Sequence, residues 1–460
     1  MSESTASEVV RRSTPHASLA ALGVRLCQLD LLAPIRRRVL IAQKRVKYAP
    51  FDKLCDCFVA LLAGAHGIVE VNLGLRADPA LQAAFGRSAC AEQSVIQATL
   101  NAATATNVAQ MEAAMDEIYR EQSRGYRHNY QANWQLLDVD ITGLPCGKKA
   151  AFATKGYFAK QKNRRGRQMG RVLATRYDEV VLDRLFPGKV QLNAALIPLV
   201  EGAEETLALK EKQRTRTILR VDAGGGTLEQ VNWVLARGYQ YHGKDYSSRR
   251  AQKLAQRVSQ WVTDPRLPER QVGWVEEEAS EYVRPVRRIA VRCRMAHDQW
   301  RVGVLLSTLT AATVLSLTGQ PSEAIVDPQA VLLAYVYLYD DRGGGVETSV
   351  KEDKQGLGIT KRNKKRFEAQ QMLMQLGTLA HNVLVWARGW LEAVEPAVSR
   401  YGIKRLVRDV FGVTGVVEIE NSGRVRQIVL NQANRLAHRC LSAFQLLVAP
   451  TSVVVSLGET

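Results

Sequence analysis

The sequence lacks the features that direct a chain out of the cell or into a membrane. Its first 16 residues, MSESTASEVVRRSTPH, are polar and contain neither an apolar core nor a small-residue cleavage site, so we expect no secretory signal. The longest apolar stretch, residues 302–317, is interrupted by Ser and Thr and is shorter than the roughly 20 residues that span a bilayer. We therefore expect a cytoplasmic protein without a membrane partner, in which this stretch forms a buried strand and helix.

Cysteine pairs with a functional spacing are also missing. The seven cysteines are an odd number and include no CxxC pair and no Cys/His grouping at zinc spacing. Reduced thiols in a reducing compartment are the simplest interpretation. Cys55 and Cys57 are separated by one residue on a predicted helix, where their side chains diverge, so the pattern favours buried structural thiols over a metal or redox site.

Acidic residues are scarce relative to basic ones. The chain has 45 Asp and Glu against 63 Lys and Arg, which gives a formal net charge of +18. Because 46% of the residues are hydrophobic, the chain can pack cores, and a disordered basic tail is excluded. A folded nucleic-acid binder is the leading class, and a basic enzyme with a small anionic substrate remains open.

The pattern of apolar residues changes along the chain. Residues 1–130 have helical spacing, and strands are predicted afterwards at 134–142, at 217–222 and at 239–242. The second strand ends in a Gly turn, and Thr227 is placed to cap the helix that follows. Pro-punctuated β segments are predicted between 262 and 330, a helical region follows Arg342, and a hairpin is predicted around 416–429.

Carboxylates follow three of these elements. Asp138 and Asp140 lie on one face of the first strand, Asp222 ends the second, and Glu347 opens the later helical region. The carboxyl ends of neighbouring strands are where open α/β sheets place ligand-binding groups. Hard cations such as Mg²⁺ prefer oxygen ligands, and two of them can activate an attacking oxygen and stabilise a leaving one. A bound metal would also reconcile an acidic cluster with a basic surface that attracts phosphate.

A basic segment follows the first strand. Residues 143–177 contain ten Lys or Arg and no Asp or Glu. We predict that Arg164, Arg165 and Arg167 lie in a turn and contact DNA phosphates, which would make binding salt-dependent. The alternative is a solvated face.

Three blocks of sequence carry a family resemblance: Leu137–Thr142, Leu219–Gly224 followed by Arg237–Tyr239, and Tyr339–Arg342 leading to Glu347 and Lys354. In this order they resemble the DDE transposases of bacterial insertion sequences, in the branch with a Y-R-E-K signature. The resemblance implies an α/β fold with an RNase H-like catalytic core, a β-rich insertion and a helical N-terminal domain.

Carried over residue by residue, the resemblance makes Asp140, Asp222 and Glu347 the catalytic, metal-binding triad, with Asp138 as the competing first carboxylate. It implies Mg²⁺ or Mn²⁺, with two ions. The implied DNA-binding residues are Tyr339, Arg342, Lys351 and Lys354. Four residues separate Arg342 from Glu347 where the family usually has three, and we expect Gly343–Gly345 to absorb the extra residue as a bulge or helix start.

The implied activity is metal-dependent strand cleavage and strand transfer on double-stranded DNA, at terminal inverted repeats and target DNA, by a nucleoid-associated homodimer. The expected domains are a DNA-end-binding domain (1–130), two parts of the core (131–261 and 331–395), an insertion (262–330) and a C-terminal hairpin and helix (396–460). A helix-turn-helix at 79–100 would turn Arg87, Glu92, Gln93 and Gln97 towards a groove, and Trp274 or Trp300 could stack on displaced bases.

Two alternatives remain. A transposase-derived protein could bind DNA without cutting it. The segment Asp222–Thr227 also resembles a phosphate loop of the actin and Hsp70 ATPases, although the earlier Asp-x-Gly loop and the adenosine-binding Gly pair of that class have no good match.

Overall fold

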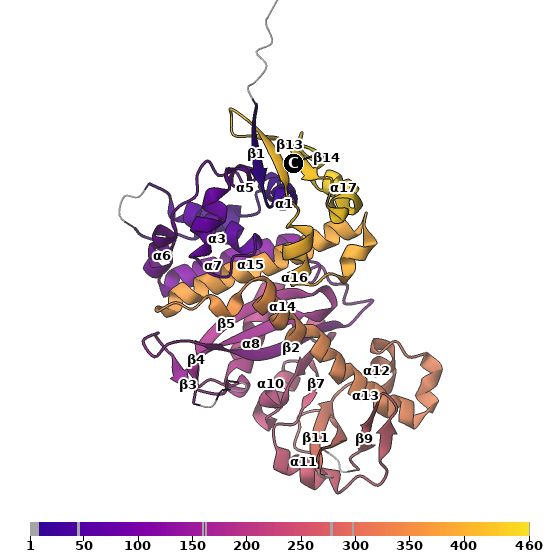
Figure 1. The fold of residues 1–460 in the computed structure, drawn as a ribbon. Coiled ribbons are helices and arrows are strands. Elements are labelled where there is room, and N and C mark those ends of the chain that lie inside the picture. Colours follow the sequence, from indigo (N-terminus) through magenta and orange to yellow (C-terminus); the bar gives the residue numbers. More distant parts are fainter. Residues whose placement is uncertain are drawn as a thin grey trace, which may run out of the picture. The chain divides into compact units, whose positions relative to one another are not determined.

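The computed structural model describes residues 9–43, 47–158, 161, 163–276, 279–296 and 299–459. The chain forms two compact units, each assembled from more than one segment of the sequence (Figure 1). The first unit comprises residues 1–123, 146–153 and 350–460, and the second comprises 124–145 and 154–349. These units group the chain differently from the five predicted domains, whose assigned roles stay predictions.

A ten-stranded sheet organises the second unit. Its strands are β2 (Gln135–Pro145), β3 (Thr154–Lys155), β4 (Arg165–Ala174), β5 (Glu179–Pro187), β6 (Thr217–Val221), β7 (Gln240–Lys244), β8 (Val262–Asp264), β9 (Leu267–Trp274), β10 (Arg287–Arg294) and β11 (Trp300–Ser307).

The first strands of this sheet have RNase H-like connectivity. β2, β4 and β5 pair as an antiparallel meander, and β6 and β7 then add in parallel on the other side of β2. Numbered along the chain, these five strands lie in the order 3-2-1-4-5. The predicted α/β fold with an RNase H-like core is confirmed.

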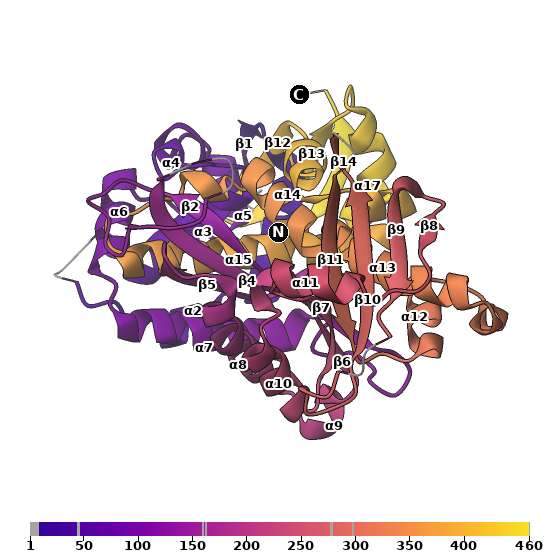
Figure 2. The same ribbon diagram turned by 90° about the horizontal axis from the view of Figure 1, so that it is seen from below.

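The predicted β-rich segment extends the same sheet. β11 pairs antiparallel with β7, and β10, β9 and β8 continue outwards side by side (Figure 2). Buried residues of these strands, such as Ile289 and Leu305, form a core with Tyr335 from the helix α13 (Pro328–Arg342). Trp274 packs against this core, with its ring 5.4 Å from that of Tyr335. Trp274 is therefore partly buried against this core, and its stacking on bases stays a prediction.

The remaining helices of the second unit are α8 (Leu192–Leu207), α9 (Glu211–Arg214), α10 (Leu228–Ala236), α11 (Ser248–Ala255) and α12 (Ala311–Leu317). Two of the helix starts follow directly from sequence. The Thr227 side chain accepts a hydrogen bond from the Gln230 amide, as predicted, and Asp327 accepts one from Gln329 just before Pro328 opens α13. The predicted strand and helix at 302–317 correspond to β11 and α12.

The first unit is mainly helical. Its helices are α1 (Ala17–Gln28), α2 (Ala33–Arg38), α3 (Pro50–Leu62), α4 (Glu70–Leu73), α5 (Pro79–Ala84), α6 (Gln93–Ala102), α7 (Ala105–Gln122), α15 (Phe367–Glu392), α16 (Ile403–Arg405) and α17 (Arg435–Val448). Its sheet has the order β1 (Val9–Thr14), β12 (Gly415–Glu420), β13 (Val425–Asn431) and β14 (Val454–Gly458). β12 and β13 are the predicted hairpin. Within the described ranges, no helix is both long and apolar enough to cross a membrane.

Candidate active site

Asp140 and Asp222 lie at corresponding positions on neighbouring parallel strands. Val139 of β2 pairs with Val221 of β6, and each Asp is the next residue along its chain. Beyond Val221 the Asp222 side chain accepts a 2.8 Å hydrogen bond from the Gly224 amide and begins the 3₁₀ turn Ala223–Gly225. Parallel strands therefore bring the two carboxylates to one edge of the sheet, as the sequence predicted.

Asp138, the competing first carboxylate, has a structural partner. Its two oxygens accept hydrogen bonds from Nε and Nη2 of Arg220, at 2.6 and 2.8 Å, and both side chains are buried. A bidentate pair of this kind occupies the carboxylate on both oxygens. Asp138 therefore links β2 to β6 through its ion pair with Arg220. The side chain of Asp140, by contrast, is 20% exposed and can be reached from solvent.

Arg342 lies between Asp140 and Glu347. Its Nη2 is 3.4 Å from Oδ1 of Asp140, its Nη1 is 3.0 Å from Oε1 of Glu347, and Nη2 also donates to the Val139 carbonyl. The guanidinium is 2% exposed, while the Glu347 side chain is 58% exposed. One buried cation therefore links Asp140, which lies just beyond the pairing of β2 with β6, to Glu347, which follows α13.

The extra residue between Arg342 and Glu347 is absorbed by a π-helix. Residues Gly343–Glu347 form this turn, and Gly345 departs from helical backbone angles within it. A Cβ at Gly345 would lie 2.5 Å from Oδ2 of Asp138 and 2.8 Å from the Thr175 methyl carbon, so only Gly fits there. The wider turn brings Arg342 and Glu347 into contact at a five-residue spacing. Of the two predicted possibilities, a bulge or a helix start, the structure has a π-helical bulge.

Burial and charge raise the pKa of Asp140 to about 6. Loss of surrounding water is the largest cause, and the charges of Asp222 and Glu347 act in the same direction, whereas Arg342 lowers the value. The repulsion shows that the three predicted carboxylates share one electrostatic environment. A further positive charge would stabilise them.

A complete coordination shell is not assembled here. In the described part of the chain, no group of three or more His, Cys, Asp and Glu side chains is arranged to hold a metal ion. The chemistry of the donors nevertheless fits a hard divalent cation, because all three are carboxylates and Asp140 is destabilised by its acidic neighbours. Arg342 provides the positive charge between two of them.

Tyr339 lies one turn before Arg342 on α13 and contacts a lysine that the sequence analysis missed. The Lys244 amine is 4.8 Å from the centre of the Tyr339 ring. Burial raises the pKa of Tyr339, and the charges of Asp222, Glu347 and Asp140 raise it further. The sequence offered one indication of this residue: Lys244 is the last residue of the strand that follows Asp222 and the helix α10.

Lys351 and Lys354 lie on α14 (Thr348–Gly356), which begins directly after Glu347. They fall in the first unit, and their predicted role in DNA binding stays a prediction. Lys351 is exposed and Lys354 is half-buried.

The predicted turn at 164–167 is wrong. Arg165 is the first residue of β4, and Arg167 lies within that strand with no exposed surface. A fully buried guanidinium cannot reach a phosphate, so Arg167 is removed from the candidate DNA-binding residues. Arg164 and Arg165 are exposed and remain candidates. The lysines at 160 and 162 of the same basic segment lie outside the described residues.

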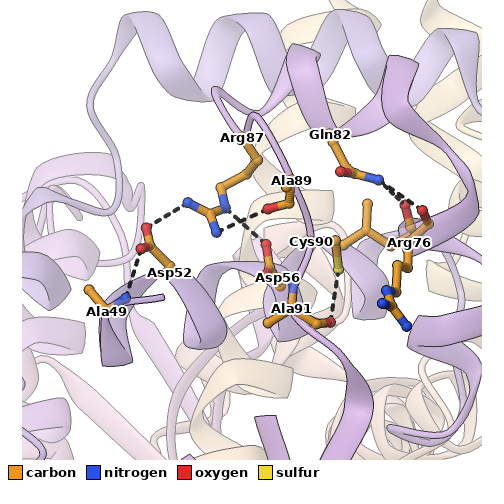
Figure 3. A network of polar contacts seen from close by, with 10 residues as sticks. Ala49, Asp52, Asp56, Arg76, Gln82, Arg87, Ala89, Cys90 and Ala91 are labelled. Atoms are coloured by element: carbon orange, nitrogen blue, oxygen red, sulfur yellow. Dashed lines mark hydrogen bonds and ion pairs between the residues drawn. The ribbon is translucent and has the colours of Figure 1, made fainter. Parts of the chain in front are cut away.

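Arg87 is a structural residue of the first unit, contrary to its predicted place in a DNA groove. Its guanidinium donates to Asp56 at 2.9 Å and to Asp52 at 2.6 Å, both on α3, and its side chain is 13% exposed (Figure 3). Asp56 also accepts a hydrogen bond from the Ala91 amide. These contacts fasten the loop between α5 and α6 to α3.

Trp300 is partly exposed at the start of β11. The guanidinium of Arg292 lies 4.6 Å from its ring centre and 4.0 Å from that of Trp261. A cation between two indole rings is a favourable arrangement in itself. Stacking of Trp300 on bases stays a prediction.

Most of the chain matches one family of known sequences. The sequence model described as transposase DDE domain, group 1, matches residues 38–445. The chain is also similar to a solved structure, the piggyBac transposase synaptic complex with hairpin DNA, with a TM-score of 0.46 and 11% identity over 87% of this chain and 82% of that one. Among curated proteins no match is found.

Proposed function

The chain belongs to the transposase DDE domain family, group 1, and from this premise we propose that it cuts DNA at the ends of an insertion sequence and transfers the freed 3′ ends to target DNA. The observation that carries the proposal is the alignment of Asp140 and Asp222 across β2 and β6, with Glu347 linked to Asp140 through Arg342. The six residues between Glu347 and Lys354 support membership of the Y-R-E-K branch, whereas the added residue between Arg342 and Glu347, which lies in the π-helix, departs from its spacing.

In this proposal Asp140, Asp222 and Glu347 hold Mg²⁺ or Mn²⁺. Two such ions would activate the attacking oxygen and stabilise the leaving one in both cleavage and strand transfer. Arg342 positions Asp140 and Glu347 through its two contacts, and the Asp138–Arg220 pair fixes the strands that present the triad. The sheet therefore supplies a rigid frame for carboxylates that must bind cations at defined positions.

The proposed partner is double-stranded DNA, bound first at terminal inverted repeats and then as target. The charge of +18 provides attraction to the phosphate backbone, and the exposed Arg164 and Arg165 contribute to it beside the core sheet. We propose a homodimer on the DNA, because two element ends must be cut and joined together.

The experiment that tests this function uses DNA that flanks the coding region. A supercoiled plasmid carrying both flanks is incubated with the purified chain and Mg²⁺ or Mn²⁺. We expect breaks at inverted repeats in the flanks, and we expect EDTA to abolish them. Specific binding of the flanks without breaks would favour a non-catalytic derivative, and ATP hydrolysis that ignores DNA would favour the ATPase alternative.

A further inference from the structure

Asp140 and Asp222 lie side by side on β2 and β6, and Lys244 occupies the corresponding position on the next strand, β7. Val221 of β6 pairs with Gly243 of β7, so Lys244 stands beside Asp222 as Asp222 stands beside Asp140. Three consecutive parallel strands therefore present Asp, Asp and Lys at one edge of the sheet. The backbone pairing of the parallel strands alone places Asp140, Asp222 and Lys244 side by side.

The surroundings of Lys244 restrict where its amine can lie. The loop after Asp222 packs on the Lys244 backbone, because a Cβ at Gly226 would collide with the Lys244 carbonyl oxygen. The Tyr246 amide donates to the Gly226 carbonyl at 3.3 Å and closes the same contact. On the other side the Tyr339 ring faces the amine at 4.8 Å. A cation on an aromatic face is held without being neutralised.

The acidic groups near Lys244 have other partners. Asp340 pairs with Arg270 at 2.6 Å, and one oxygen of Asp222 accepts from the Gly224 amide. Across the described residues, Lys244 forms no ion pair with any carboxylate. A lysine that lies beside a carboxylate cluster and keeps an unpaired charge is suited to an anion supplied from outside the chain.

We propose that the Lys244 amine binds a non-bridging oxygen of the DNA phosphate that is cut at Asp140 and Asp222. This inference rests on the proposed function and names a residue that touches the substrate. The ammonium opposes the charge that builds on the phosphate oxygens as the attacking oxygen approaches, while Tyr339 keeps the lysine chain aimed along the sheet edge. Arg342 is not proposed to bind the phosphate, because its guanidinium is buried and forms ion pairs with Asp140 and Glu347.

Lys244 is exposed at the end of β7, so a bound phosphate can reach its amine. An arginine at this position would keep the positive charge and carry it on a planar guanidinium.

The test compares Lys244→Gln and Lys244→Arg with wild type in the metal-dependent plasmid cleavage assay. Lys253→Gln is the matched control, because Lys253 is also an exposed lysine but lies on α11, outside the row formed by Asp140, Asp222 and Lys244. We expect Lys244→Gln to lower kcat/KM about 10²-fold with an unchanged thermal midpoint. We expect Lys244→Arg to retain most activity, because it keeps a positive charge at the same position.

Three results would overturn the inference. Wild-type cleavage by Lys244→Gln would show that the amine does not touch the phosphate. Equal loss in both variants together with a lower thermal midpoint would show a structural role. If wild type and all variants fail to cut while Asp222→Asn behaves identically, the proposed function itself fails, and this inference falls with it.

Discussion

The guanidinium of Arg220 binds both carboxylate oxygens of Asp138, and this pair separates the two aspartates of β2 into different roles. Asp138 is buried with a full set of partners, while Asp140, two residues later, lies at the end of the pairing with β6 beside Asp222 and Arg342. The two residues share a strand face, but only one of them is available to a substrate or an ion.

Asp138→Asn should destabilise the fold. The substitution leaves the buried Arg220 guanidinium without a counter-charge, and breaking a buried pair costs about 3–5 kcal/mol. Equilibrium denaturation at neutral pH measures this loss. A variant as stable as wild type would show that the Asp138–Arg220 pair does not hold β2 and β6 together.

Asp140→Asn should have the opposite effect on stability in metal-free protein. The pKa of Asp140 is raised from 3.8 to about 6, so the folded state binds more protons than the unfolded state between these values. Stability therefore falls as pH rises through this window, by up to about 3 kcal/mol above pH 7.

The Asn variant lacks this penalty. Its free energy of unfolding should exceed that of wild type at pH 8 and match it near pH 3. Denaturation at several pH values with EDTA present measures the difference, and a constant gap across the series would argue against a raised pKa.

Gly345→Ala should impair cleavage, and Gly344→Ala should not. A Cβ at Gly345 meets Asp138 and Thr175, so the π-helix and Glu347 must shift, whereas no atom lies within 4 Å of a Cβ at Gly344. A shift of about 1 Å at a catalytic group can cost on the order of 10²-fold in rate. Cleavage rates and thermal midpoints of the two variants test this difference. Equal cleavage by both would show that the backbone of the π-helix at Gly345 does not position Glu347.

Arg164 and Arg165, the exposed arginines at the start of β4, should contribute equally to the binding of every DNA sequence. Arg164→Ala with Arg165→Ala should weaken binding and lower the slope of log affinity against log salt by roughly 0.9 for each phosphate that is no longer neutralised. Arg167→Ala provides the comparison, because it removes a buried side chain and should reduce stability without that change in slope. Titration of one duplex at several salt concentrations tests this, and an unchanged slope in the double variant would indicate a solvated surface.

Local patterns predicted much of the sheet. The local pattern predicted β2 and β6, and Thr227 was predicted to cap α10, because these signals depend on neighbours within a few residues. The carboxylates on three separate elements predicted that these elements meet at one end of the sheet. The Gly run after Arg342 predicted a bulge or a helix start, because Gly accepts strained backbone. The close approach of Gly345 to Asp138 became visible only in the structure.

The failures involve partners that are distant in sequence. Arg87 meets Asp52 and Asp56 across more than 30 residues, and β1 pairs with β12 across 400, so neither was visible from local pattern. The arginines at 164–167 resembled a turn, although pairing with β2 draws Arg167 into a buried strand. A single lysine at the end of a strand does not predict a functional site. The position of Lys244 beside Asp222 became apparent only from the register of β7 with β6.

The most direct measurement is metal-dependent cleavage of the flanking DNA by Asp140→Asn, Asp222→Asn and Glu347→Gln, with DNA affinity measured on the same preparations. The account predicts that each variant loses cleavage with both Mg²⁺ and Mn²⁺ and keeps near wild-type affinity, because each change removes a metal ligand and leaves the basic surface intact. Cleavage at the wild-type rate by any of the three would contradict the assignment of that carboxylate to the active site.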